Sequence, residues 1–213
     1  MPSTVYPPSE SDATPPGTLS PQDAQIIAAR GGYGAEDPAA TITADDIAEV
    51  AHQLGRTPRG MVAISARCVC GRPWAVKTAP RLDDGTPFPT LFYLTHPALT
   101  AAASTLEAAG VMKEMTQRLS EDESLAAAYR SAHEAYLAER EALAHVSEIE
   151  GISAGGMPTR VKCLHVLIGH SLSAGPGQNP LGDEAIALAI NARLFTPGQC
   201  QCVARPAEEA ADG

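Results

Sequence analysis

The sequence predicts an α+β fold in which a small three-stranded antiparallel sheet packs against about five helices, preceded by a disordered N-terminal arm. Three observations lead to this prediction. Short β-type segments separated by turn residues occupy positions 61–94, helical patterns fill most of the chain after position 97, and prolines crowd the first 40 residues. A chain of 213 residues is long enough for one domain with a sizeable core.

The arm is expected over residues 1–40, an acidic flexible tail over 203–213, and a single domain over 41–202. The arm mixes prolines with Ser, Thr, Ala and Gly, so it offers too little apolar surface to offset the entropy lost on ordering. A short helix is expected within it at residues 23–29.

The first helix of the domain is expected after Thr43, a good N-cap residue. Ile47, Val50 and Leu54 recur at helical spacing, and Gly55 is suited to end the helix. Strands are then expected at residues 61–66, 74–78 and 88–94. The turn-forming stretches 68–73 and 83–85 separate them, so an antiparallel sheet is the simplest product.

Helices fill the remainder. His96 is the expected N-cap of a helix that begins at Pro97, and a short helix follows at 111–119. Ser120 and Glu123 match a capping box, which predicts a long helix from there to about residue 145.

A helix that begins at Pro158 is expected to carry Cys163, and Asn179-Pro180 is expected to start the last helix.

The segment 161–170 is the main candidate site because it sets Cys163, His165 and His170 among apolar residues. Reactive polar groups are costly to bury without partners. On a regular helix Cys163 and His165 point about 200° apart, and Cys163 and His170 are separated by about 10 Å of rise. Neither pair is then expected to hold one metal ion by itself. A satisfied core cysteine and core histidine are the alternative interpretation of Cys163 and His165.

Any metal therefore needs ligands from elsewhere, and Zn or Fe are the candidate ions. The candidate ligands are Cys163, His96 and His165. The pairs Cys68/Cys70 and Cys200/Cys202 form an alternative four-thiolate zinc site, although structural sites usually space paired cysteines by two to four residues. An odd count of five cysteines disfavours a closed disulfide framework, which indicates a reducing, cytoplasmic location.

A basic stretch lies between Val50 and Leu82, where no acid occurs. It is either an anion-binding surface or a solvated sheet face. The formal net charge of −10 and the lack of a known nucleic-acid motif disfavour nucleic acid as a partner. No apolar run approaches the length of a membrane span, and no signal peptide is recognised. The six basic residues of the stretch are Arg56, Arg59, Arg67, Arg72, Lys77 and Arg81.

The chain resembles the actinobacterial family of domain of unknown function 501, over roughly residues 43–190. The resemblance rests on three blocks of sequence. They are Thr78-Ala79-Pro80-Arg81-Leu82 through Asp84-Gly85-Thr86-Pro87-Phe88-Pro89-Thr90-Leu91; Ala154-Gly155-Gly156-Met157-Pro158 through Arg160-Val161-Lys162-Cys163-Leu164-His165; and Gly175-Pro176-Gly177 with Asn179-Pro180 and Gly182-Asp183-Glu184-Ala185.

The resemblance implies a soluble cytoplasmic protein and carries no established activity. Genes of this family tend to lie beside those for a septum-formation initiator and an exopolyphosphatase-like enzyme, which suggests a link to cell division or phosphate metabolism. The proline-rich start and the Cys200/Cys202 end fall outside the family pattern, and the Cys68/Cys70 turn is variable in it.

Two principal hypotheses follow. The first is a non-enzymatic binding or regulatory module for an anionic, phosphorylated small molecule or a partner protein, with Lys77, Arg81, Arg160, Lys162 and Asn179 as the ligand-binding residues. The second is a thiol- or metal-dependent enzyme. Its catalytic residues are Cys163 with His96 or His170, and an acid from Asp183 or Glu184. A scaffold whose proline-rich arm recruits a partner is a third alternative.

Overall fold

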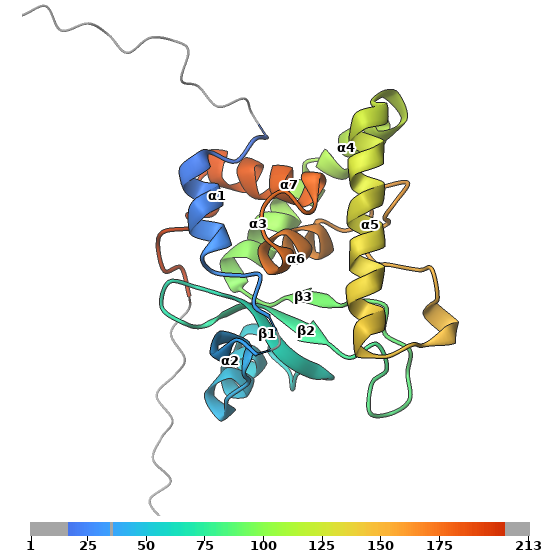
Figure 1. Cartoon of the computed structure of the whole chain (residues 1–213). Helices are drawn as coiled ribbons and strands as arrows, with labels where there is room; N and C mark the ends of the chain where they lie inside the picture. Colours follow the sequence, from blue (N-terminus) through green and yellow to red (C-terminus); the bar gives the residue numbers. More distant parts are fainter. Residues whose placement is uncertain (1–16, 35, 203–213) are drawn as a thin grey trace, which may run out of the picture.

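The structure is a computed structural model that describes residues 17–34 and 36–202 (Figure 1). The predicted tail at 203–213 and residues 1–16 of the predicted arm lie outside the described residues. Within the described part the α+β prediction is confirmed. Three antiparallel strands pack against seven α-helices, two more than the approximate number expected.

The sheet has the order β1 (Met61–Arg67), β2 (Pro73–Thr78) and β3 (Phe92–Leu94). Val76 in the central strand pairs with Ile64 on one side and Tyr93 on the other. The prediction of a strand over 88–94 is wrong in its first half, because β3 begins only at Phe92. Pro87 and Pro89 lack the N–H that a paired strand would donate, and the chain before β3 instead forms a loop closed by a hydrogen bond from Phe88 N to Pro80 O.

Helices cover both faces of the sheet (Figure 1). On one face, α2 (Ala44–Leu54) packs Val50 against Ile64 and Val76. As expected, Thr43 caps α2 and Gly55 ends it, with a φ of 65°. On the other face lie α3 (Pro97–Ala108), α6 (Leu164–Ala174) and α7 (Pro180–Asn191), and the main core forms between them and the sheet.

The helix α1 (Pro21–Ala28) belongs to this core layer, although the sequence places it in the flexible arm. Ile27 is fully buried in the main core. Two backbone hydrogen bonds hold the residues after α1. Gly32 N donates to Ser173 O of α6, and Arg67 N of β1 donates to Arg30 O. The described residues before position 41 are therefore folded against the domain.

Two helices stand beside these layers, α4 (Val111–Glu121) and the long α5 (Glu123–Leu143) (Figure 1). The expected capping box at Ser120 is wrong, because Ser120 lies inside α4. Asp122 caps α5 instead, and its Oδ1 accepts from the N–H groups of Ser124 and Leu125. A charged carboxylate that accepts two orphan N–H groups is the stronger cap.

The helix α6 is largely buried, and it begins at Leu164 and not at Pro158, where the sequence predicts its start. The backbone before it is bonded to other elements and so cannot form helical bonds. Lys162 N donates to Gly155 O, Val161 N donates to the Thr116 hydroxyl of α4, and Arg160 O accepts from the Tyr129 hydroxyl of α5. Cys163 is consequently the N-cap residue, in an extended conformation with a φ of −157°.

The start of α7 follows the prediction. Asn179 is its N-cap, and its Oδ1 accepts from Gly182 N at 3.0 Å. None of the helices among the described residues combines the length and the apolar character needed to cross a membrane.

Candidate functional site

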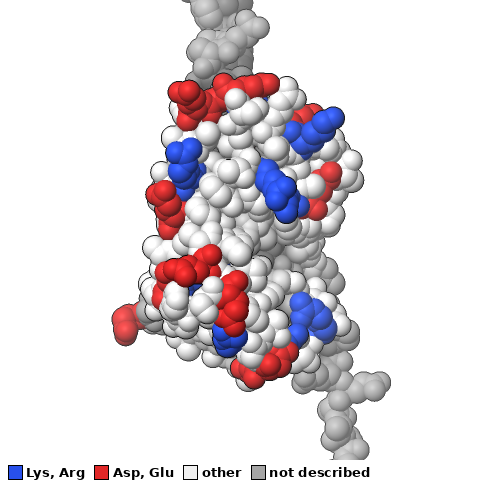
Figure 2. Space-filling model, turned by 90° about the vertical axis from the view of Figure 1, so that its right-hand side faces the viewer, with Lys and Arg blue, Asp and Glu red and all other residues white. Residues whose placement is uncertain are grey.

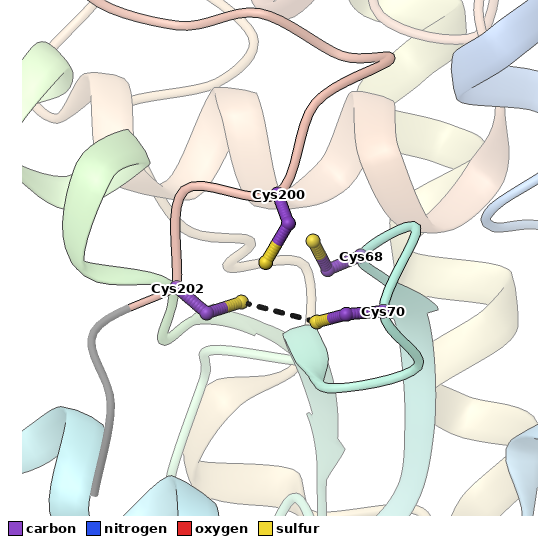
Figure 3. A group of neighbouring side chains, drawn as sticks. All are labelled: Cys68, Cys70, Cys200 and Cys202. Atoms are coloured by element: carbon purple, nitrogen blue, oxygen red, sulfur yellow. Dashed lines mark hydrogen bonds between the residues drawn. The ribbon is translucent and has the colours of Figure 1, made fainter.

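Four cysteines from two distant segments form a cluster, which we call the four-cysteine cluster: Cys68, Cys70, Cys200 and Cys202. Figure 3 shows their side chains directed toward a common centre, two from the turn between β1 and β2 and two from the segment after α7. All four sulfur atoms lie within 4.8 Å of one another. Cys70 Sγ and Cys202 Sγ are 3.5 Å apart.

A tight turn places the first pair. Gly71 has a φ of 89°, Cys68 N donates to Arg72 O, and Gly71 N donates to Cys68 O. The second pair follows Phe195, which is buried and packs edge-on against Trp74 of β2 at 5.5 Å between ring centroids. Burial of Phe195 thus anchors the C-terminal segment beside the turn.

His96 lies against this cluster and not against Cys163. Its Nε2 is 3.4 Å from Cys202 Sγ, and the ring is fully buried beside Trp74. Burial lowers the pKa of His96 to about 4, so the imidazole is neutral at pH 7. Its Nδ1 has no hydrogen-bond partner in the part of the chain that the structure describes.

The thiols of the cluster differ in acidity. Burial is the largest influence on Cys68 and Cys202 and raises the pKa of both thiols. At Cys70 burial acts in the same direction, but the backbone N–H of Arg72 and the neighbouring thiols outweigh it and lower the pKa. Cys70 is therefore the thiol of the three that loses its proton most readily.

A second group consists of Glu107, Cys163 and His165, whose ligand-type atoms also lie within 4.8 Å of one another. Cys163 Sγ is 3.9 Å from His165 Nδ1, and the same nitrogen is 3.1 Å from Glu107 Oε1. The expectation that Cys163 and His165 point apart is therefore wrong. The angular rule applies within a helix, and Cys163 precedes the first helical residue.

Glu107 has a structural task as well. Its Oε1 accepts from Leu164 N at 2.7 Å, so a carboxylate from α3 caps α6, whose own N-cap residue makes no side-chain cap bond. The contact with Cys163 is the largest cause that raises the pKa of His165 to about 9, burial opposes the rise, and Glu107 adds to it. The imidazole is consequently protonated at pH 7.

This group opens onto a cavity of about 380 Å³ whose lining includes Cys163, His165 and Tyr93. Both Cys163 and Glu107 contact the Nδ1 side of the ring, while Nε2 faces Ser104 Oγ at 3.4 Å. A hydrolase relay uses the two nitrogens separately, one for the nucleophile and one for the orienting acid. The group therefore suits an imidazolium–thiol pair better than such a relay.

His170 lies apart from both groups, on a buried part of α6. Its ring stacks on Phe92 at 5.4 Å, meets Tyr136 edge-on at 5.2 Å, and contacts Asn179 Nδ2 through Nδ1 at 3.1 Å. Burial lowers its pKa to about 4. His170 and the fully buried Asn179 thus act together as packing and capping groups at the start of α7.

The two acids of α7 have separate partners. Asp183 Oδ2 accepts from Gly177 N at 2.6 Å, and burial raises the pKa of this carboxyl group. Both oxygens of Glu184 accept from Arg118 of α4, at 2.6 and 2.7 Å. The recorded contacts of His96, His170, Asp183 and Glu184 do not join any of them to Cys163, so the predicted catalytic set is not assembled among the described residues.

The basic stretch is largely neutralised by acids from other elements. Arg81 makes a two-oxygen contact with Glu148, and Lys77 pairs with Glu139 of α5. Figure 2 shows basic and acidic side chains interspersed over the face that it presents. The predicted ligand residues Arg160 and Lys162 are exposed beside the start of α6. Three further ion pairs complete the set, namely Arg59 with Asp84, Arg67 with Asp46, and Arg72 with Glu49.

Arg56 is the exception among the six. It makes no ion pair with another described residue, and its guanidinium donates to Tyr93 Oη at 3.2 Å and to Thr57 O at 3.5 Å. It stands at a cavity of about 520 Å³ between the end of α2, the sheet and the loop before β3. The wall is mostly apolar: Val50, Leu54, Pro58, Met61, Val76, Leu82, Phe88 and Tyr93.

Sequence reasoning missed two of these features. Glu107 gave no signal, because a single acid near the end of an amphipathic helix is ordinary. The Arg56 cavity arises because α2 stops at Gly55 and leaves part of the sheet uncovered, which only the packing reveals. The four-cysteine cluster had a signal in its two Cys-x-Cys pairs, but their meeting depends on the buried Phe195.

A family model with the description "Protein of unknown function (DUF501)" matches residues 64–187. No curated protein and no solved structure matches the chain. The matched residues include Cys68, Cys70 and Cys163, and they end before Cys200 and Cys202.

Proposed function

The chain belongs to the DUF501 family of proteins of unknown function, and we propose that it is a non-enzymatic binding module for a small molecule with an apolar body and one anionic group. The observation that carries this proposal is the cavity of about 520 Å³ that combines apolar walls with Arg56. Cavities of about 300–1,000 Å³ with few polar groups are typical of small-molecule sites.

The charge argument favours Arg56 over Arg81 and Lys77, and Arg160 and Lys162 do not line the cavity. A carboxylate that already pairs with a guanidinium offsets its charge and so weakens its attraction for a second anion. Arg81 and Lys77 have such partners, whereas the partners of Arg56 among the described residues are a phenol and a carbonyl group. Tyr93 Oη holds the Arg56 side chain at the cavity, so a carboxylate or phosphate there gains a hydrogen bond to a charged donor.

The apolar walls supply the second part of the recognition. Val50 and Val76 are almost fully buried, and Leu54, Met61 and Tyr93 surround them on the α2 face of the sheet. Burial of an alkyl chain there contributes about 0.8 kcal/mol for each CH₂ group. The proposed ligand is therefore an alkyl carboxylate or an alkyl phosphate. The alkyl phosphate would agree with the link to phosphate metabolism that the family resemblance suggests.

The test is a calorimetric titration of the full chain with decanoate, decyl phosphate and the uncharged analogue decanol. We expect both anions to bind, and Arg56→Gln to weaken their binding about tenfold, because loss of one charge-assisted hydrogen bond costs about 1.5 kcal/mol. Decanol binding should be unchanged by this substitution.

Arg130→Gln, at an exposed position of α5, is the matched control and should bind like the wild type. Equal effects of the two substitutions, or no binding of either anion, would reject the proposal and leave a partner protein as the ligand to be sought.

A thiol enzyme is the second candidate, favoured by the contact between Cys163 Sγ and a protonated His165 at the mouth of a cavity. An imidazolium beside a thiol is the arrangement that activates cysteine nucleophiles. It uses His165 and Glu107 in place of the His96, His170, Asp183 and Glu184 set.

Alkylation by iodoacetamide at pH 7, followed by peptide mass mapping, tests this candidate. Cys163 should react faster than free cysteine, and His165→Gln should bring its rate down to that of free cysteine. A wild-type rate equal to that of free cysteine would count against an activated thiol.

A further inference from the structure

The four-cysteine cluster has the dimensions of a metal site. With a Zn–S distance of about 2.3 Å, a tetrahedron of thiolates has sulfur atoms about 3.8 Å apart. The cluster brings all four sulfurs within 4.8 Å of one another, with 3.5 Å between Cys70 and Cys202. A shift of less than about 1 Å at any pair therefore completes the tetrahedron.

The donor set selects the kind of ion. Four thiolates favour Zn²⁺ or a single iron, because both accept tetrahedral sulfur coordination. A cluster of several irons would need its cysteines further apart, since bridging sulfides and metals lie between the thiolates. Four protein ligands leave no open position, which is the mark of a structural site rather than a catalytic one.

The surroundings supply what a thiolate site needs beyond its ligands. Donors to the sulfur atoms orient and stabilise metal-bound thiolates. The fully buried His96 presents Nε2 to Cys202 Sγ at 3.4 Å, and this ring is held against Trp74. An apolar shell on the inner side is formed by Trp74 and Phe195.

The one-residue spacing within each pair is compatible with shared coordination. In the first pair, the tight turn closed by the hydrogen bond from Gly71 N to Cys68 O brings both thiols to one side, so a Cys-x-Cys pair can direct both thiols at one ion. Figure 3 shows this for both pairs.

We propose that Cys68, Cys70, Cys200 and Cys202 bind one Zn²⁺ ion as a closed tetrathiolate site that fastens the segment after α7 to the turn between β1 and β2. This inference is independent of the proposed ligand cavity at Arg56, which shares no residue with the cluster. On binding, each thiol releases its proton to solvent and donates a sulfur lone pair to the ion.

The test begins with elemental analysis of the full, untagged chain purified without chelator, followed by titration of the reduced, metal-free protein with Co²⁺. We expect one zinc per chain, and one equivalent of Co²⁺ with the visible absorption of tetrahedral cobalt–thiolate coordination, abolished by added Zn²⁺. One iron per chain would overturn the choice of ion while keeping the ligand set.

Variants assign the ligands. Cys70→Ser and Cys200→Ser, both at exposed positions, should lose the stoichiometric metal and the cobalt absorption while keeping the wild-type circular dichroism spectrum. Cys163→Ser is the matched control because Cys163 belongs to the other group, and it should retain both. Loss of metal in Cys163→Ser but not in Cys70→Ser would overturn the assignment.

A thiol count separates the metal site from two disulfides. The chain has five cysteines, so denatured protein treated with chelator but never with reductant should show five reactive thiols if a metal held the cluster. A count of one would mean that the four cysteines are paired as disulfides. Five thiols with no metal and no cobalt absorption would likewise reject the proposal.

Discussion

At the scale of single residues, the contacts of His165 with Cys163 and Glu107 determine whether its imidazole is charged. Cys163 and Glu107 hold the pKa of its imidazole at about 9 in the folded chain, compared with 6.5 in an unfolded one. A group whose folded pKa is raised adds stability that is fully present below pH 6.5 and is lost as the pH rises through about 9.

We therefore predict that the free energy of unfolding falls between pH 6.5 and pH 9 more steeply in the wild type than in His165→Gln. Urea denaturation across this range measures the difference. In an NMR titration, Glu107→Gln should lower the His165 pKa, while the glutamine still accepts from Leu164 N and preserves the cap of α6. An unchanged His165 pKa in Glu107→Gln would contradict the role given to the carboxylate.

The same residues mark the limit of prediction from sequence at this scale. The helical wheel placed Cys163 and His165 on opposite sides, and it failed because Cys163 lies before the helix. The wheel assumes that the chain is already helical, whereas hydrogen bonds to Thr116 and Tyr129 keep residues 160–163 out of the helix. These partners lie on other helices, so no local pattern could have revealed them.

At the scale of elements, the close approach of α6 and α7 depends on Gly182. A Cβ atom at this position would stand 2.2 Å from Leu167 O and 2.5 Å from Ser171 Oγ, both in α6. The backbone of α6 cannot move aside as a flexible side chain would. The packing of the two helices therefore requires a residue without a side chain.

We predict that Gly182→Ala lowers the free energy of unfolding by about 2 kcal/mol, measured by urea denaturation. Alanine gains about 1 kcal/mol in helix propensity over glycine, but overpacking of this severity costs about 3 kcal/mol. Gly34→Ala is the control, because nothing lies within 4 Å of its Cβ position and its φ is not positive. Equal stability of the two variants would show that α7 can shift without loss.

Elements were predicted well where a cap lies next to its own helix. Thr43, His96 and Asn179 marked the starts of α2, α3 and α7, because capping and proline signals act within one turn. The starts of α5 and α6 were wrong. The N-cap of α5 is Asp122, two residues after the predicted Ser120. The N-terminus of α6 is capped by Glu107, which lies on another helix.

At the scale of the whole molecule, the sequence indicated the composition of the layers but not which distant segments meet. The sheet and the mixed fold followed from alternating turns and periodic stretches. The packing of α1 into the core did not, because one apolar pair among prolines gives too weak a signal, although Ile27 is fully buried. The two Cys-x-Cys pairs are visible in the sequence, but no local pattern shows that Cys70 and Cys202, 132 positions apart, come into contact.

This long separation gives the four-cysteine cluster a consequence for synthesis and for the unfolded chain. The proposed metal ion would cross-link positions 132 residues apart and would remove loop-closure entropy that the chain-entropy model puts at about 5 kcal/mol. Cys200 and Cys202 follow every described helix and strand in the chain, so the proposed link would close only after all of these elements have been synthesised. A chain truncated before Cys200 would lack that restraint in its unfolded state.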